Sequence, residues 1–600
     1  MRNSGLIDAD VDGISAWDDL TLTNEGRIEA GDDGVDAEDG LILTNSGTID
    51  AGYWAVNAGE DADVTNAEGG ELIADRAAID VLGGAVIRNH GLIDGGYNGI
   101  YADDSLELTN TGRIEAEDHG GEAGDDAGIT NSGSIRAQHD AINVDERATI
   151  VNATTGSIVS QHEDAIDLDS GTVLNYGLIR PVSGEAAIDF DDSEVAVSTI
   201  TNHGTISGAV AINVALGEDE DPQAIENSAA QVVVNHGRII GTDGTALQLG
   251  AGKDQIDIYS MDIEGLVDLG ADDDTLIVRA TVQNGVVYFA SDPETIDMDE
   301  APDTAIYDDM KLVVASRDSF AGMDAHVTEH ALGLGKSALV PMPDATGDGL
   351  AFCEQGLGDG AWWATGSVGV FDGDGSGRLS LGRDGARAGV FLSYGRISAT
   401  LSDGHDLISD STLLGLHGGT GLPGGAQLVG IAYLGFGTIE MRSPLTASGR
   451  GSAETQILGL AGSVASAPSA SGVSVVARAG IEHQRIGEMT MSGLGGASFG
   501  ARDVTSGYVS AELRMEHGLA AGRVITPFLG LDVLFTDGED VTMTLGSGST
   551  RFATGTGGSS AQLILGAELG STGQPWHLRI EGQYDDSGAA GGSLTAGLRF

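Results

Sequence analysis

The sequence is poor in cysteine, proline, aromatic residues and positive charge. It has 600 residues and one cysteine, Cys353, so no disulfide can form within the chain. Such a chain could cross a membrane without intrachain disulfides locking its fold before it arrives. No apolar run reaches the roughly 18 residues that a transmembrane helix requires, which excludes a helical membrane span. Strands that alternate in polarity are not excluded by this test.

The scarcity of positive charge is most pronounced in the first part of the chain. Residues 345–600 hold 24 acidic and 14 basic residues, and the totals are 92 and 28. The first 344 residues therefore hold 68 acidic and 14 basic residues. A domain with this charge does not bind nucleic acid and avoids anionic membrane surfaces. Solubility or a saline environment explains the acidity more simply than divalent-cation binding, which stays open as the alternative.

A short motif, Asn-x-Gly-x-Ile, recurs in this acidic part. Its first complete copy is Asn24-Glu25-Gly26-Arg27-Ile28. Most copies lie 21 residues apart, and both steps of 23 follow copies with two extra residues between Asn and Gly. A fixed period near 20 residues predicts a solenoid. The repeated asparagines are Asn3, Asn24, Asn45, Asn66, Asn89, Asn110, Asn131, Asn152, Asn175, Asn202 and Asn235.

Each repeat carries a second motif about half a period later, as in Ala141-Ile142-Asn143-Val144. Apolar and polar residues alternate in both motifs, which is typical of strands with one face inside. Two short strands per repeat, separated by Gly, Asp and Asn turns, leave no room for a crossover helix. The pattern therefore predicts a right-handed parallel β-helix with one coil of about 21 residues per repeat.

The repeated positions have structural roles in such a coil. The Ile residues stack into an internal aliphatic ladder, and the Asn residues form an amide ladder in which each side chain bonds to the next coil. The Gly two residues after Asn permits a positive φ where the chain bends. None of these residues is therefore a candidate site.

Other polar motifs of this region are weak candidates for metal sites. His90, His203 and His236 each follow a repeated Asn, so they belong to the repeat, with zinc binding as the alternative. Residues 249–256 and 269–276 resemble nonapeptides of calcium-binding β-rolls, but they lie 20 residues apart instead of nine. Two more coils with acidic turns explain them more simply. We expect no metal site and no cofactor.

A helical pattern follows the repeats. Asp318 or Ser319 can cap its start, whereas Gly333 and Gly335 weaken its last turn. Apolar residues at helical spacing lie on one face of this segment. They are Phe320, Met323, Val327, Ala331 and Leu334.

From Gly360 onward lysine is absent, glycine and alanine rise, and long alternating strands appear. Two weaker strands, near 377–383 and 541–553, accompany eleven clearer ones. In residues 576–584, His577, Arg579, Glu581 and Gln583 share one face and apolar residues share the other. About twelve long strands fit an even-stranded, antiparallel transmembrane barrel with a polar lumen better than a soluble β-sandwich.

The last strand ends on an aromatic residue. This ending resembles the C-terminal signal by which outer-membrane barrels are recognised for assembly. The alternating residues of this signal are Leu594, Ala596, Leu598 and Phe600.

A β-helix, a helix and a barrel that ends in Phe together resemble an autotransporter of type V secretion. The more specific motifs are residues 362–369, 527–532 and 594–600. The resemblance implies a barrel in the outer membrane of a Gram-negative bacterium, inserted by the barrel assembly machinery and in contact with outer-membrane lipid. It also implies a helix through the lumen and an N-terminal passenger displayed at the cell surface.

On this reading the all-β chain has four parts. They are β-helix passenger repeats (1–280), the solenoid end and junction (281–315), the linker helix through the lumen (316–344) and the 12-stranded barrel (345–600). Two features depart from the family. The sequence opens directly into a coil without a signal peptide, so we expect either a mispredicted start or a fragment of a longer gene. The helix also lacks the Asn-Asn pair that some members use for self-cleavage, so release of the passenger is unsupported.

We do not expect the passenger to be an enzyme. It has no Gly-Asp-Ser-Gly or Gly-x-Ser-x-Gly motif. Residues 372–376 look like the start of an EF-hand, but Arg383 occupies the position that needs a bidentate Glu, so a barrel turn is expected there. The passenger is expected to be an adhesin or a stalk. Its expected partner is an unknown extracellular ligand or a host surface. The alternative from another class is a soluble acidic β-solenoid scaffold with an appended β-sandwich.

Overall fold

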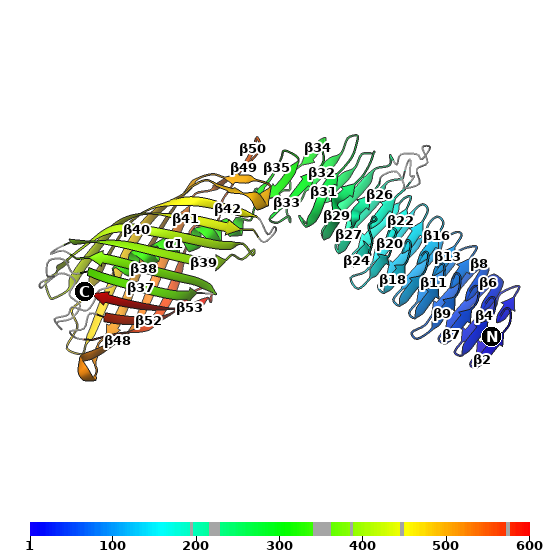
Figure 1. Ribbon diagram of the computed structural model, residues 1–600, viewed down its shortest axis with the longest axis horizontal. Coiled ribbons are helices and arrows are strands. Elements are labelled where there is room, and N and C mark those ends of the chain that lie inside the picture. Colours follow the sequence, from blue (N-terminus) through cyan, green and yellow to red (C-terminus); the bar gives the residue numbers. More distant parts are fainter. Residues whose placement is uncertain are drawn as a thin grey trace. The chain divides into compact units, whose positions relative to one another are not determined.

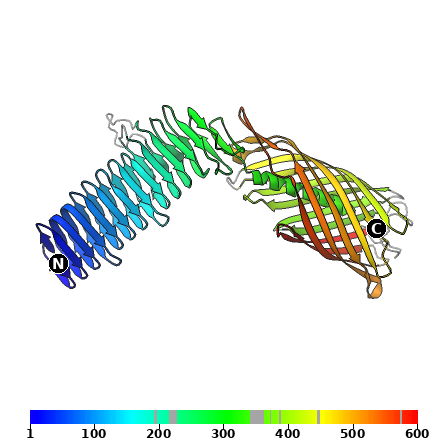
Figure 2. The same cartoon turned by 180° about the vertical axis from the view of Figure 1, so that it is seen from behind.

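The computed structural model describes residues 1–191, 196–214, 228–339, 362–371, 373–384, 388–443, 449–571 and 576–599. The chain divides into two compact units. One unit comprises Met1–Pro302 and Asp309–Leu312, and the other comprises Asp303–Asp308 and Val313–Phe600. The first is a parallel β-solenoid, and the second is a closed antiparallel barrel with a helix inside (Figures 1 and 2).

Each regular coil of the solenoid has three short strands. One coil comprises β14 (Leu106–Asn110), β15 (Arg113–Ala116) and β16 (Gly121–Ala123), and each strand pairs in parallel with its equivalent in the next coil. The expectation of two strands per coil was wrong, because the Asn corner divides the first motif between β14 and β15. The strands run from β1 (Arg2–Asn3) to β34 (Thr295–Asp297), which still pairs in parallel with the preceding coil.

The two predicted ladders are present. Ile28, Ile49 and Ile114 are fully buried and lie above one another in register with their equivalents. The repeated asparagines are buried as well, and each amide donates to the next: Asn110 Nδ2 lies 2.8 Å from Asn131 Oδ1. The ladder satisfies the polar groups of the corner inside the solenoid, where an unpaired amide would be costly.

The glycines of the Asn-x-Gly corners have another role than the one expected. Gly26, Gly47 and Gly133 do not have a positive φ. A Cβ on Gly47 would lie 1.9 Å from the carbonyl oxygen of Gly26, one coil earlier. Glycine is therefore required because successive corners approach closely.

The two stretches that resemble calcium-binding nonapeptides form further coils. β30 (Gln255–Ile258) pairs in parallel with β32 (Thr275–Val278). Asp254 Oδ1 accepts a hydrogen bond from the Gln231 amide at 2.7 Å, and Asp274 Oδ1 accepts one from the Asp254 amide at 3.0 Å. These acidic side chains thus cap backbone amides of the preceding coil, which is the simpler explanation given above.

The second unit is a closed barrel of twelve antiparallel strands. Closure occurs between β46 and β48, which pair from Val504–Gly538 to Arg514–Phe528, so the alternative of a β-sandwich was wrong. The wall strands are β37 (Trp362–Phe371), β38 (Asp374–Arg383), β39 (Ala388–Thr400), β40 (Asp406–Gly421), β41 (Gln427–Arg442), β42 (Arg450–Ala465), β43 (Val473–Ile486), β46 (Arg502–Met515), β48 (Arg523–Gly538), β51 (Gly558–Ser571), β52 (Trp576–Asp585) and β53 (Ala590–Arg599).

Of the two weaker predicted strands, only one belongs to the wall. Residues 377–383 lie in β38, whereas residues 541–553 form a hairpin outside the wall. This hairpin belongs to a separate four-stranded sheet, which we name the distal sheet. It comprises β44 (Met489–Met491), β45 (Ala497–Phe499), β49 (Val541–Leu545) and β50 (Gly548–Phe552). We name the end of the barrel that carries this sheet the distal end. The end where β37 begins and β53 finishes is the proximal end.

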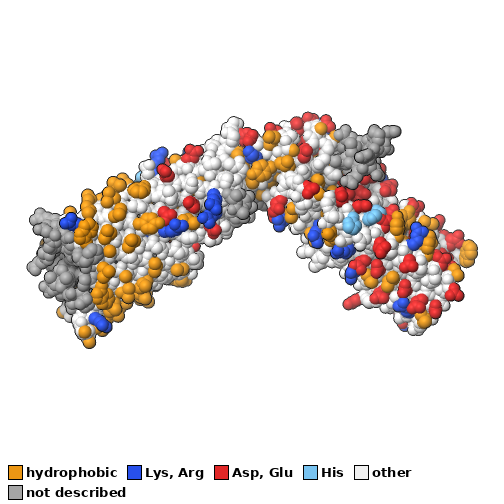
Figure 3. All heavy atoms as spheres, viewed as in Figure 1, with side chains coloured by type: hydrophobic (Ala, Val, Ile, Leu, Met, Phe, Trp, Pro, Cys, Tyr) orange, Lys and Arg blue, Asp and Glu red, His pale blue; other side chains and the backbone are white. Residues whose placement is uncertain are grey.

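The barrel has its apolar side chains outside and its polar side chains inside. In β52, Ile580 is 59% exposed, whereas its neighbour Arg579 is 8% exposed. Phe436 and Leu565, on other strands, are 64% and 65% exposed. Figure 3 shows hydrophobic side chains over the outer surface of the barrel. This inversion is what a wall in contact with lipid requires.

Glycines opposite aromatic rings recur along the wall. Gly459 lies directly across from Tyr433, and a Cβ there would be 2.1 Å from the tyrosine ring. Gly480 faces Tyr508 in the same way. Each glycine leaves the space in which the ring lies, which explains part of the glycine content of this unit.

Helix α1 (Arg317–Ala338) begins one residue after Ser316, whose side chain accepts a hydrogen bond from the Ser319 amide at 3.2 Å. The prediction that Asp318 or Ser319 caps the helix was wrong, because both lie inside its first turn. Among the described residues, no helix combines the length and apolarity needed to cross a membrane.

Candidate functional site: the barrel lumen

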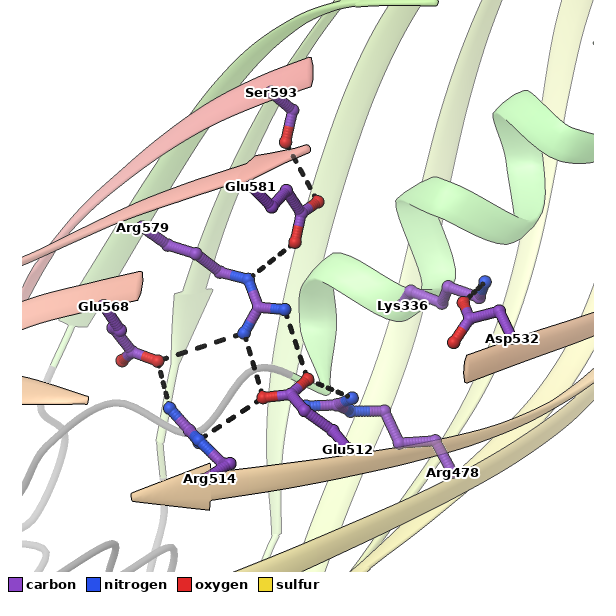
Figure 4. Close-up of polar contacts among 9 residues, drawn as sticks. All are labelled: Lys336, Arg478, Glu512, Arg514, Asp532, Glu568, Arg579, Glu581 and Ser593. Carbon is purple, nitrogen blue, oxygen red and sulfur yellow. Dashed lines mark hydrogen bonds and ion pairs between the residues drawn. The ribbon is translucent and has the colours of Figure 1, made fainter. Parts of the chain in front are cut away.

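Helix α1 lies in the lumen of the barrel and contacts strands around it, among them β39, β40, β43 and β46 (Figures 1 and 4). The apolar face that the sequence predicted for this helix is buried, including the four residues expected in the lumen. They are Phe320, Met323, Val327 and Ala331.

The two ends of α1 have different apolar neighbours. At the distal end the ring of Phe320 packs against Phe499, with centroids 4.6 Å apart, and against Phe552 at 5.8 Å. Toward the proximal end Ala331 joins a cluster with Leu413 and Val429. The helix is thus packed along its length, and not only at one end.

Gly333 and Gly335 allow the helix to approach the wall. A Cβ on Gly333 would lie 2.3 Å from the Arg378 guanidinium, and one on Gly335 would lie 2.6 Å from the Tyr433 hydroxyl. The helix continues through both glycines, so the close packing that they permit offsets their low helix propensity. From the sequence we read these residues only as a weakness of the last turn.

Among the described residues, Asp324 and Lys336 of α1 form ion pairs with the wall, and His326 Nε2 lies 2.7 Å from Asp374 Oδ2. Asp324, fully buried, bonds to Arg502 Nη2 at 2.6 Å and to Thr556 Oγ1 at 3.1 Å. Near the other end, Lys336 Nζ lies 2.7 Å from Asp532 Oδ2. Removing one partner of a buried pair leaves an uncompensated charge, at a cost of about 3–5 kcal/mol.

A larger network of charges lies on the wall beside the last turns of α1 (Figure 4). Glu512 is at its centre, with nitrogen–oxygen distances of 2.9 Å to Arg478, 3.3 Å to Arg514 and 3.2 Å to Arg579. The outer members of the network are Glu568, Glu581 and Ser593.

The charge network borders a cavity of about 150 Å³ between α1 and the wall. Lys336 and Glu329 of the helix face it together with Arg478, Glu512 and Arg579. This volume is large enough for several water molecules. The charged side chains give the cavity a polar surface along which a chain can lie.

The lumen also contains a Ser–His–Asp cluster at the distal end. Ser319 Oγ lies 3.1 Å from His405 Nδ1 and bonds to Asp403, and Asp403 Oδ2 lies 3.0 Å from the same Nδ1. A proton relay needs the serine and the carboxylate on opposite ring nitrogens. The cluster therefore ties the start of α1 to the turn between β39 and β40 and has no relay geometry.

The histidines of the solenoid repeat form part of an aromatic stack. The rings of His203 and His236 are 4.4 Å apart and lie between Tyr176 and Tyr259. Across the described ranges, no group of three or more His, Cys, Asp or Glu residues could hold a metal ion. In the EF-hand-like stretch, Phe371 pairs with Asp374 in a tight hairpin; Asp372 lies outside the described residues.

Three carboxyls of the solenoid, Asp164, Asp167 and Asp189, form what we name the acidic stack. Asp167 and Asp189 pair in register on successive coils, and Asp189 is 8% exposed. Burial and, to a lesser extent, neighbouring carboxylates raise the pKa of each to about 8. These neighbours include Asp140 and Asp191. The carboxyls of the acidic stack are thus largely protonated near neutral pH.

The predicted assembly signal lies on the outer face of the last strand. Leu594 and Leu598 of β53 are 40% and 55% exposed, and Ala596 lies on the same face. Phe600 lies outside the described residues. The role of this strand in assembly remains a prediction.

Sequence reasoning found the helix and its buried face but missed the charged partners. The inward position of Arg579 and Glu581 was readable from alternation. The pairing of Arg579 with Glu512 joins residues 67 positions apart, and that of Lys336 with Asp532 spans 196 positions. No local pattern carries such information.

Comparison with known proteins adds a family. Residues 363–583 match the autotransporter beta-domain family. The translocator domain of the autotransporter NalP from Neisseria meningitidis is similar at 17% identity and a TM-score of 0.34, covering 47% of this chain and 100% of that one. The beta domain of the Bordetella autotransporter Brka is similar at 16% identity and a TM-score of 0.31, covering 40% of this chain and 99% of that one. The transport unit of the autotransporter AIDA-I from Escherichia coli is similar at 11% identity and a TM-score of 0.28, covering 42% of this chain and 94% of that one.

No curated protein sequence matches the chain. The family match covers most of the barrel, from β37 to β52, and the barrel follows a β-solenoid in the chain. Residues 363–583 are therefore an autotransporter β-domain, as the sequence predicted.

Proposed function

We propose that the barrel inserts in the outer membrane of a Gram-negative bacterium and displays the acidic solenoid at the cell surface, as an adhesin or a stalk. The observation that carries this proposal is the position of α1. The helix comes just before the barrel in the chain and after the solenoid, and it fills a polar lumen whose outer wall is apolar. A segment in this position is expected for a chain that has passed through the barrel.

The displayed solenoid is proposed to act by contact and not by catalysis. Its surface is acidic and poor in aromatic residues, which argues against broad hydrophobic adhesion. We propose a polar or charged ligand on another surface. We also propose that the solenoid stays attached, because α1 lacks an Asn-Asn pair and is held by Asp324 and Lys336.

Surface display is tested by protease treatment of intact cells. The chain is expressed with a secretion signal in a Gram-negative host, and an external protease is added before and after permeabilisation. We expect loss of the solenoid and protection of a fragment that begins near α1. If the solenoid is protected in intact cells while the barrel is in the membrane fraction, export has not occurred. Recovery of the whole chain in the soluble fraction would overturn the proposal.

The role of the last strand is tested in the same cells. Leu598→Asp places a charge on the outer face of β53, where lipid contact and assembly are expected to fail. The matched control is Thr595→Asp, on the inward face of the same strand. Loss of heat-modifiable migration in the first variant but not in the second is the expected result.

A further inference from the structure

The distal sheet holds a carboxylate from the chain segment that precedes the helix. Asp308 ends β35 (Ala305–Asp308), and its Oδ2 accepts hydrogen bonds from the Ser547 amide at 2.6 Å and from Ser547 Oγ at 2.8 Å. The Gly548 amide donates to the same oxygen. Three donors from the turn between β49 and β50 thus converge on one oxygen. Successive amides that point into one concavity are a common receptor for anions.

The backbone of this turn is shaped for the contact. Gly546 has φ +53°, and the Asp308 carboxyl lies 3.1 Å from the position of a Cβ there. A Cβ on Gly548 would lie 3.0 Å from Ile306 Cδ1. A side chain at either glycine would therefore crowd β35. The two-residue hairpin turn itself favours a glycine at position 546, whereas Gly548 lies in β50, where only the contacts with Ile306 and Asp308 exclude a side chain.

Further contacts extend the interaction on both sides of the carboxylate. Ala305 and Ile306 are buried, and Thr550 Oγ1 donates to the Asp303 carbonyl at 2.8 Å. On the same face of the sheet as Thr550, Phe499 and Phe552 contact the first turn of α1 through Phe320. The sheet is therefore in contact with the chain both before the helix and where the helix begins.

We propose that the distal sheet is a docking site for residues 303–308, with the turn at 546–548 as a receptor for the carboxylate of Asp308. Docking fixes the chain where it leaves the lumen, independently of the ion pairs inside. On the proposed function, the solenoid is displayed outside the cell and is exposed to mechanical force. A fixed exit segment then keeps this force from being transmitted to α1.

The site is tested by hydrogen exchange of the full chain, folded in detergent micelles. Asp308→Ala is expected to lower the protection of the amides in residues 303–308 and 546–552 about tenfold or more, because it removes a charge-assisted set of hydrogen bonds. Asp309→Asn is the control. It removes the same charge from the next residue, whose carboxylate is 63% exposed and pairs with Lys311, and asparagine tolerates the positive φ of 53° at this position.

A second variant alters the receptor turn instead of the carboxylate. Gly548→Val is expected to lower the protection of residues 303–308 by a clash with Ile306, and the double variant is expected to add little to either change. Heat-modifiable migration and unchanged protection at the proximal end verify that the barrel is folded.

Two results would overturn the proposal. One is equal protection of residues 546–552 in Asp308→Ala and the unaltered protein, and the other is an equal effect of Asp309→Asn. The purified chain does not need to be exported for this experiment. Failure of surface display in cells would therefore leave its result intact, and the two proposals can fail separately.

Discussion

Replacement of one interior asparagine of the ladder is expected to loosen the solenoid on both sides of the altered coil. Asn110 is fully buried, and its amide connects two neighbouring coils. It accepts a hydrogen bond from Asn89 at 2.9 Å and donates to Asn131 Oδ1 at 2.8 Å and to the Ser134 carbonyl at 3.2 Å. Asn110→Ala removes all three bonds and leaves a small cavity.

The magnitude follows from what each partner retains. Asn89 Nδ2 still donates to the Arg113 carbonyl at 3.0 Å, and Asn131 Oδ1 still accepts from the Gly133 amide at 3.2 Å. No partner is left wholly unsatisfied, so each lost bond costs about 0.5–1.5 kcal/mol and not the full desolvation penalty. The sum is about 2–4 kcal/mol. In a solenoid this cost falls on the interfaces of the altered coil with its two neighbours.

Hydrogen exchange by mass spectrometry measures this local cost. A loss of about 2–4 kcal/mol lowers protection by a factor of about 30 to 1,000 in peptides from the altered coil and its neighbours. Thr109→Ala is the control, because Thr109 precedes Asn110 in β14 and points outward. Less than a fivefold difference between the two variants would refute the claim that the amide ladder stabilises the coils.

Two further predictions concern pH and the barrel wall. The acidic stack has a folded pKa of about 8 against 3.8 in the unfolded chain, so its stabilising effect is complete below pH 3.8 and is lost as the pH rises to about 8. Asp189→Asn should flatten this decline, by at most about 4 kcal/mol, in thermal unfolding followed by circular dichroism between pH 5 and pH 8; an unchanged pH slope would contradict the assignment. Gly459→Val should prevent the Tyr433 ring from seating and abolish heat-modifiable barrel assembly, whereas Gly430→Val, where a Cβ meets no atom closer than 4.0 Å, should assemble normally.

The solenoid was largely readable from the sequence because its partners recur at a fixed spacing. A residue contacts its equivalent about 21 positions away, as Asn24 does Asn45, so the period itself identifies the neighbours. What the period does not contain is the corner geometry. The three-sided coil and the close approach at Gly47 depend on how backbones stack, and the sequence shows only that a glycine is present there.

The barrel was readable as a sequence of strands but not as a lumen. Alternation identifies which side chains share a face, and it placed Arg579 and Glu581 opposite to Leu578 and Ile580. It does not say which strand lies across the lumen. The contact of Asp324 with Arg502 spans 178 positions and depends on the register of α1 inside the closed wall.

The two units therefore solve one problem in two ways. Each has polar groups in its interior, and each must satisfy them without bulk water. The solenoid repeats one neutral amide, so a single local rule satisfies every coil and an error stays local. The lumen uses charged pairs that are each different, such as Lys336 with Asp532, and these fix one position of the helix. A repeated interior suits a part that varies in length, and a unique interior suits a part that must stop a chain at one place.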